Sequence, residues 1–289
     1  MKIHPTAIVD KNAELEGDVE IGPGAVIASR VKIGVGCRIG PNAVIDSGTI
    51  LGRDVRVHAG AVIGTEPQDW KYGGYPTGVE IGEGTIIREY VTINRATGEG
   101  GMTRIGPRCM LMINCHIAHE CKVGEGVIMA NLATLGGHVE VEDFTVIGGM
   151  AVIHQFVRVG RMAMVGGASG LMKDAPPYMI TFGYPPARVY GVNKVGMRRN
   201  GVSDKTRDDI KRAFKFLFRS GLNFSQGLER IREEIDPSPE IQHLIEFFNK
   251  TRRGISPPSR QNGMLSHHLH YTEGELRSTI EMARRIGAI

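Results

Sequence analysis

The chain has 289 residues and a formal net charge of +4, with 41% hydrophobic and 23% charged residues, which is typical of a globular protein. The charge is too small and too dispersed to indicate a nucleic-acid-binding protein. The 39 glycines argue against a mainly helical enzyme, because glycine destabilises helix interiors.

Three features of the sequence concern its location. Residues 1–10, MKIHPTAIVD, contain no apolar core of signal-peptide length. No stretch approaches the roughly 20 apolar residues that a membrane span needs. The four cysteines form no CxxC pair. We therefore expect a cytoplasmic protein with reduced thiols and without stable membrane insertion.

Residues 3–171 carry a repeat with a period of six. Every sixth residue from Ile3 to Leu171 is Ile, Leu, Val or Met, and the exceptions are Asp69, Tyr75 and Glu99. Four residues after most of these guide aliphatics there is a small side chain, and all four cysteines occupy that second position. We interpret the cysteines as buried wall residues and not as metal ligands. Hexapeptides of this kind are typical of a parallel β-helix, in which three consecutive hexapeptides make one coil.

Two glycine-rich excursions interrupt the repeat. The first, GTEPQDWKYGGYPTGVE (64–80), contains Asp69, Trp70 and Lys71, and the second is ATGEGGMT (96–103). Loops that leave a rigid scaffold often carry binding residues, although Trp70 is equally consistent with an anchor packed on the wall.

The stretch MINCHIAHEC (112–121) places two histidines inside the repeat. His116 and His119 occupy positions that should face outward. A glycine follows His119 after one coil, which is three hexapeptides, and a glutamine follows it after two coils. The predicted column and its flanking histidines are His119, Gly137, Gln155, His138 and His154. An imidazole beside a bare glycine amide is suited to acyl transfer, because the ring can act as a base and the N–H can bind an oxyanion.

After residue 193 the six-residue period stops and helical patterns begin. Ser203 can cap a helix that ends at Gly221, and a second helix is predicted near Gln226–Ile235. A third helix begins at Ser238, with proline as its first residue.

The last part of the chain is predicted to be a linker over residues 255–271, followed by a helix from Thr272 to about Ile286. The linker histidines His267, His268 and His270 could bind metal, but a solvated linker is favoured. The sequence thus predicts two domains, a β-helix over 1–193 and an α-helical domain over 194–289.

Several motifs together resemble one enzyme family. The segments PQDWKY, MINCHIAHEC, LGGHV, IGGMAVIHQF, MVGGASG and APPYMI look like the UDP-N-acetylglucosamine O-acyltransferases of lipid A biosynthesis, over about residues 1–253. The resemblance implies a left-handed parallel β-helix and a homotrimer. It also implies transfer of a 3-hydroxyacyl chain from acyl carrier protein to the 3-position of UDP-N-acetylglucosamine. The donor is the acyl carrier protein thioester, and no cofactor or metal is expected.

The resemblance also implies roles for individual residues. His119 matches the general base, and Gly137 matches the amide that binds the oxyanion. Asp69 matches a contact to the substrate hydroxyl, and Gly167 matches a position that limits acyl length. The other matched substrate-binding positions are Lys71, His116, His138, His154, Gln155, Asn193 and Arg199.

Other interpretations stay open. The acceptor could carry a 3-amino group, because three positions depart from the family pattern. Glu120 follows His119 where many members have aspartate, and Asn94 and Val195 occupy positions where many members have histidine and an acidic residue. A non-catalytic β-helix scaffold is the alternative from another class, although it would not need these histidines and two excursions on one side. A zinc enzyme of carbonic-anhydrase type is disfavoured, because the HxxxxH pair is missing and Cys121 stands five residues after His116.

Overall fold

The structure is a computed structural model that describes residues 1–259, of which residues 1–258 form one compact unit. The predicted last helix, the three linker histidines and most of the predicted linker lie outside the described residues. Among residues 1–259, no helix combines the length and apolar character that a membrane crossing requires.

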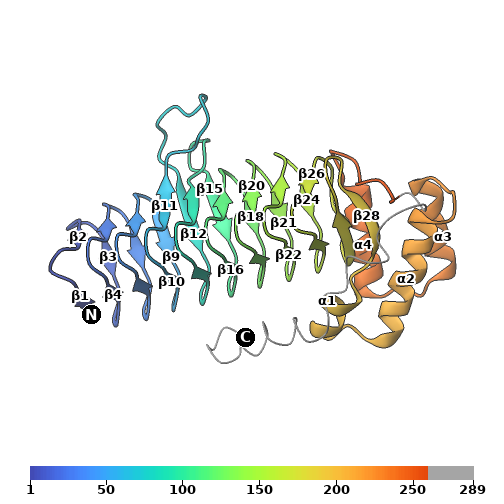
Figure 1. Cartoon of the computed structure of the whole chain (residues 1–289), viewed down its shortest axis with the longest axis horizontal. Helices are drawn as coiled ribbons and strands as arrows, with labels where there is room; N and C mark the ends of the chain where they lie inside the picture. Colours follow the sequence, from blue (N-terminus) through green and yellow to red (C-terminus); the bar gives the residue numbers. More distant parts are fainter. Residues whose placement is uncertain (260–289) are drawn as a thin grey trace. The chain divides into compact units, whose positions relative to one another are not determined.

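Short parallel strands wind into a three-sided β-helix (Figure 1), and up to β26 consecutive strands along the chain belong to consecutive sheets. Sheet A contains β1 (Lys2–Ile3), β4 (Glu20–Ile21), β7 (Arg38–Ile39), β10 (Arg56–Val57), β13 (Ile86–Ile87), β16 (Met110–Leu111), β19 (Ile128–Met129), β22 (Val146–Ile147), β25 (Met164–Val165), β27 (Met179–Phe182) and β28 (Arg188–Val192). Sheet B contains β2 (Ile8–Val9), β5 (Val26–Ile27), β8 (Val44–Ile45), β11 (Val62–Thr65), β14 (Thr92–Asn94), β17 (His116–Ile117), β20 (Thr134–Leu135), β23 (Val152–Ile153) and β26 (Gly170–Leu171). Sheet C contains β3 (Glu14–Leu15), β6 (Lys32–Ile33), β9 (Thr49–Leu51), β12 (Gly78–Ile81), β15 (Met102–Ile105), β18 (Lys122–Val123), β21 (Glu140–Val141) and β24 (Arg158–Val159).

The guide aliphatics of the six-residue repeat fill the inside of the β-helix. Ile27, Ile45 and Ile117 are buried, and equivalent guides stack in register from coil to coil, as Ile27 does on Ile45. The small second position is buried as well and holds all four cysteines as free thiols. The sequence prediction of the core is therefore confirmed, because the hydrophobic effect turns the same two positions of every hexapeptide inward.

The two excursions lengthen two coils. Where neither interrupts the chain, strands pair at a step of three hexapeptides, as Ile117 does with Leu135. The pairing of Val62 with Thr92 spans the length of five hexapeptides, and that of Thr92 with His116 spans the length of four. The extra residues leave the wall as loops, and Figure 1 shows the loop between β11 and β12 standing out from it.

Within residues 1–259, four helices follow the β-helix: α1 (Lys194–Arg199), α2 (Asp204–Phe218), α3 (Phe224–Glu234) and α4 (Pro239–Asn249). Ser203 and Ser238 cap α2 and α4 as predicted, each by accepting a hydrogen bond from a backbone N–H of the first turn. Helix α2 ends at Phe218, earlier than predicted. Helix α3 begins at Phe224, because Asn223 forms a capping box with Gln226.

The helices pack on the end of the β-helix, and the chain then returns to it. Tyr178 and Val189 share one apolar cluster with helix residues such as Phe247. The predicted linker is wrong for its first residues. Ile255 and Ser256 are buried, and the Ser256 N–H donates to the Asp174 carbonyl at 2.9 Å. Burial of the Ile255 side chain and this backbone pairing hold the segment against the last coil.

Candidate active site

The predicted histidine–glycine–glutamine column exists at the corner between sheets B and C. The His138 N–H donates to the His119 carbonyl at 2.9 Å, and the Phe156 N–H donates to the Gly137 carbonyl at 3.1 Å. These bonds continue the register of β17, β20 and β23 through the turns. His119, Gly137 and Gln155 therefore lie on three successive coils.

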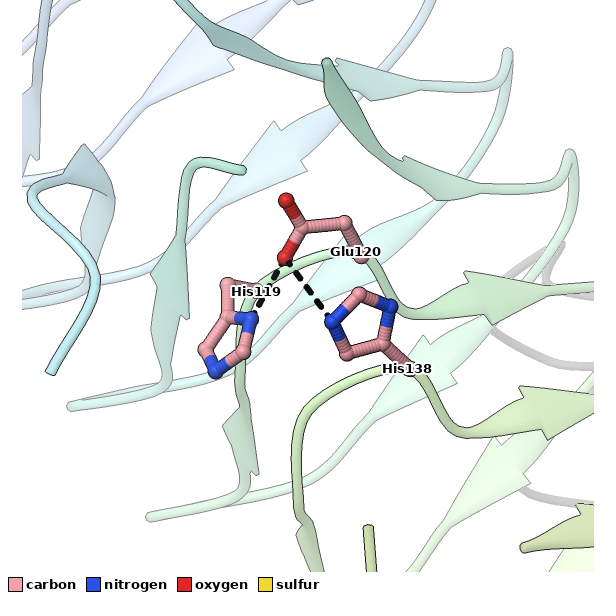
Figure 2. A group of neighbouring side chains, drawn as sticks. All are labelled: His119, Glu120 and His138. Carbon is pink, nitrogen blue, oxygen red and sulfur yellow. Dashed lines mark hydrogen bonds and ion pairs between the residues drawn. The ribbon is translucent and has the colours of Figure 1, made fainter. Parts of the chain in front are cut away.

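The imidazole of His119 lies between two carboxylates. Its Nδ1 is 2.5 Å from Oε2 of Glu120, and its Nε2 is 4.0 Å from Oδ2 of Asp69 (Figure 2 shows the Glu120 side). An ionised carboxylate can only accept, so Nδ1 carries a proton, and Nε2 is the ring nitrogen that faces Asp69. His119 points away from the wall as predicted but is 8% exposed. The excursion that brings Asp69 over the ring explains this difference.

Glu120 is the residue of the site that the sequence analysis did not assign. Its Oε1 accepts three hydrogen bonds, from the Thr97 N–H (2.5 Å), the Thr97 hydroxyl (2.7 Å) and the Gly98 N–H (3.1 Å). Burial raises the pKa of Glu120, but the hydrogen bonds from Thr97, His119 and Gly98 outweigh it and hold this pKa below its usual value. The feature of the sequence that could have identified Glu120 is its position directly after His119, the candidate base.

Gly137 lies against the face of the His119 ring. A Cβ atom at Gly137 would be 2.4 Å from Cε1 and 2.6 Å from Nε2 of that ring, so only glycine allows this approach. Among residues 1–259, the Gly137 N–H has no hydrogen-bond acceptor. The structure thus combines a bare amide and a candidate base, as the sequence predicted.

His138 completes the cluster on its other side. Its ring meets the His119 ring edge-on at 5.3 Å between centroids and stacks on Phe156 at 4.7 Å.

His119, Glu120 and His138 are also close enough together to resemble a metal site. The Nε2 of His138 is 3.7 Å from Glu120 Oε2, and the possible ligand atoms of His119, Glu120 and His138 lie within 4.8 Å of one another, as in sites that hold a metal. If a zinc ion bound Nδ1 of His119 and Oε2 of Glu120, these two atoms would be about 3.3 Å apart. The observed 2.5 Å is a hydrogen bond.

Four further predicted residues lie around this cluster. His116 shares a hydrogen bond of 2.7 Å between its Nδ1 and the Thr92 hydroxyl, and burial, with a smaller effect of His119, lowers the pKa of His116. The Lys71 N–H donates to Asp69 at 2.9 Å, and its side chain is exposed. His154 is also exposed, with its Nδ1 3.1 Å from the Gln155 carbonyl.

Three predicted residues are not brought to His119 within one chain. Gly167 lies at the other edge of sheet B, where a Cβ atom would be 3.2 Å from the Gly149 carbonyl oxygen. Asn193 is buried and caps α1: its Oδ1 accepts from the Gly196 N–H, and its Nδ2 donates to the Met162 carbonyl. Arg199 is exposed at the end of α1. Their predicted substrate roles stay predictions.

Comparison with known proteins places the chain in a family. Residues 30–65 and 102–137 match the bacterial transferase hexapeptide (six repeats), and residues 174–256 match domain 2 of UDP-N-acetylglucosamine O-acyltransferase. The acyl-(acyl-carrier-protein)–UDP-N-acetylglucosamine O-acyltransferase of Thermodesulfovibrio yellowstonii is 48% identical over 255 residues, which cover 88% of this chain and 98% of that protein. The chain belongs to the UDP-N-acetylglucosamine O-acyltransferase family.

Solved structures of UDP-N-acetylglucosamine O-acyltransferases share the fold. The enzyme of Acinetobacter baumannii is 40% identical with a TM-score of 0.84, over 88% of this chain and 99% of that one. The enzyme of Campylobacter jejuni is 41% identical with a TM-score of 0.84, over 90% and 100%. The left-handed parallel β-helix with a small helical part, expected from the sequence, is thereby confirmed.

Proposed function

We propose that this chain transfers a 3-hydroxyacyl group from acyl carrier protein to the 3-position of UDP-N-acetylglucosamine, the first step of lipid A biosynthesis. The observation that carries the proposal is the geometry around His119. Its ring is oriented by Glu120, faces Asp69 and lies against the Gly137 amide. The names of the relatives, which describe acyl transfer from acyl carrier protein to an oxygen of UDP-N-acetylglucosamine, support it.

The chemistry follows from this arrangement. A substrate hydroxyl beside Nε2 of His119 can donate its single proton to that nitrogen, and Oδ2 of Asp69 lies 4.0 Å from the same nitrogen, at the edge of the site that the sugar would occupy. Nε2 takes the hydroxyl proton while the oxygen attacks the thioester carbonyl, and Glu120 stabilises the imidazolium that forms. The Gly137 N–H binds the oxyanion, an interaction typically worth about 2.7–4 kcal/mol. The C–S bond then breaks, and the leaving thiolate takes the proton from His119.

This mechanism needs neither an acyl-enzyme nor a cofactor. Burial raises the pKa of the Cys121 thiol to about 12, and the thiols of Cys37, Cys109 and Cys115 to about 11. Such thiols are poor nucleophiles at neutral pH. The free cysteines also agree with a reducing compartment and so support the proposed cytoplasmic location.

The outer faces of the three sheets support a homotrimer. Outward positions of sheet C are mostly charged and joined by ion pairs between neighbouring strands, such as Lys122 with Glu140. Outward positions of sheet A from β13 to β25 are all apolar: Ile86, Met110, Ile128, Val146 and Met164. Sheet B presents mainly Val and Thr. Parallel sheets are normally covered on both faces, so we place sheets A and B against neighbouring copies around a threefold axis.

A trimer also gives roles to residues remote from His119. Gly167 lies at the opposite edge of sheet B from His119, and in a closed ring opposite edges of neighbouring chains can meet. We therefore propose that Gly167 limits acyl length in the site of a neighbouring chain. We also propose that Asn193 and Arg199 bind the nucleotide in a neighbour's site. Acyl carrier protein is acidic, so exposed Arg and Lys near the site should bind it, less strongly at high salt.

The test is an assay of UDP-N-acetylglucosamine with 3-hydroxyacyl carrier proteins of several chain lengths, with the 3-amino sugar nucleotide as a parallel acceptor. We expect transfer to the 3-hydroxyl with a preferred length, unchanged by a metal chelator. Transfer to the amino analogue alone would correct the acceptor. No transfer to either acceptor with any donor would favour the non-catalytic scaffold. Light scattering should give three times the chain mass of 31.5 kDa.

A further inference from the structure

The loop over residues 96–101 has no role in the mechanism above, although it lies directly beside the site. It lengthens the coil that runs from Thr92 to His116 by one hexapeptide length. Its Gly101 N–H closes a turn on the Gly98 carbonyl at 2.8 Å, and its Gly100 N–H donates to the Pro76 carbonyl at 3.2 Å. The loop is thus braced against the end of the excursion that carries Asp69.

Two residues of the loop, Thr97 and Gly98, hold one oxygen of Glu120. Oε1 of Glu120 accepts from the Thr97 N–H, the Thr97 hydroxyl and the Gly98 N–H. Because a carboxylate is planar, fixing Oε1 also fixes the direction of Oε2. Oε2 is the oxygen that contacts Nδ1 of His119 at 2.5 Å.

We propose that Thr97 is a positioning residue, which acts through Glu120 to hold His119 in the tautomer and orientation of a general base. The inference rests on the proposed function for its catalytic consequence. The titratable groups that face His119 are Glu120, Asp69, His138 and His116. Of these four, only Glu120 is hydrogen-bonded to Thr97, so the Thr97 side chain acts on the ring through Glu120.

The chain offers a matched pair of threonines for the test. Thr97→Val removes the hydroxyl donor and keeps the side-chain shape and the N–H. Thr103→Val makes the same change a few residues away on β15, where the buried hydroxyl has no hydrogen-bond partner among residues 1–259. Thr97→Ser keeps the donor and should rescue activity. We expect Thr97→Val to lower kcat by about three- to tenfold with KM for the sugar nucleotide unchanged, because hydrogen bonds to charged groups are the stronger ones. Thr103→Val should leave both constants unchanged.

A double-variant cycle tests the route through Glu120. Residues that act through one another give non-additive effects, so Thr97→Val should add nothing in a Glu120→Gln background. An equal loss in both backgrounds, or equal kcat values for Thr97→Val and Thr103→Val, would overturn the proposal.

Nitrogen NMR of histidine-labelled protein reports on the ring without any turnover. The wild type should show His119 as a single tautomer with the proton on Nδ1, and Thr97→Val should show a mixture. A His119 spectrum unchanged by Thr97→Val would refute the positioning role. If the wild type transfers no acyl group at all, the proposed function fails, and this spectrum still decides whether Thr97 orients His119.

Discussion

Substituting Gly137 by alanine tests the close approach of the imidazole to the peptide backbone. The new methyl carbon would lie 2.4 Å from Cε1 and 2.6 Å from Nε2 of His119, whereas ordinary contacts begin near 3.4 Å. The ring must therefore move by about 1 Å to restore a normal contact distance, against its hydrogen bond to Glu120. A misplacement of about 1 Å can cost about 100-fold in rate, which corresponds to about 2.7 kcal/mol in the barrier.

Steady-state kinetics with saturating acyl carrier protein thioester would measure this loss, which we expect in kcat. Gly17→Ala is the matched control, because Gly17 has the same place in its turn as Gly137 and a Cβ atom there would contact nothing within 4 Å. Neither glycine has a positive φ, so backbone strain does not complicate the comparison. A Gly137→Ala enzyme with wild-type kcat would refute the inferred contact between ring and backbone.

Two further predictions concern buried groups that take no part in the proposed mechanism. Burial raises the pKa of the Cys121 thiol to about 12, so iodoacetamide should not alkylate it in the folded enzyme, as mass spectrometry would show. The treated enzyme should also keep its activity. Stoichiometric inactivation would contradict the interpretation of Cys121 as a buried wall residue. Burial also raises the pKa of Asp174, opposed in part by hydrogen bonds from Thr251 and Arg158, so the folded state binds this proton more tightly than the unfolded chain does. The stability that this group contributes is present at low pH and is lost as pH rises through the raised pKa, so calorimetry should find Asp174→Asn gaining stability relative to the wild type between about pH 4 and 7. An unchanged difference across that range would show that Asp174 does not titrate as inferred.

The repeat made the wall of the β-helix predictable from the sequence. From Ile21 onward, each guide aliphatic, such as Ile117, is buried for the same reason, so a count in steps of six was enough to place it. The same count placed Gly137 one coil after His119, because no excursion interrupts the chain between them.

The contacts made by loops were not predictable in this way. The three bonds from Thr97 and Gly98 to Glu120 depend on where the inserted loop re-enters the wall, and a repeat count carries no information about that. The burial of His119 depends likewise on the path of the excursion that carries Asp69. The internal hydrogen bonds of Asn193 depend on the packing of α1 against the last coils, where the six-residue period has ended.

The central claim is that His119 is the general base, and replacing it by alanine tests this most directly. A general base typically contributes about 100- to 10,000-fold. We predict that kcat of His119→Ala falls within that range, while the mass of the oligomer and the melting temperature stay close to those of the wild type. A folded variant that keeps kcat within a few-fold of the wild type would contradict the assignment.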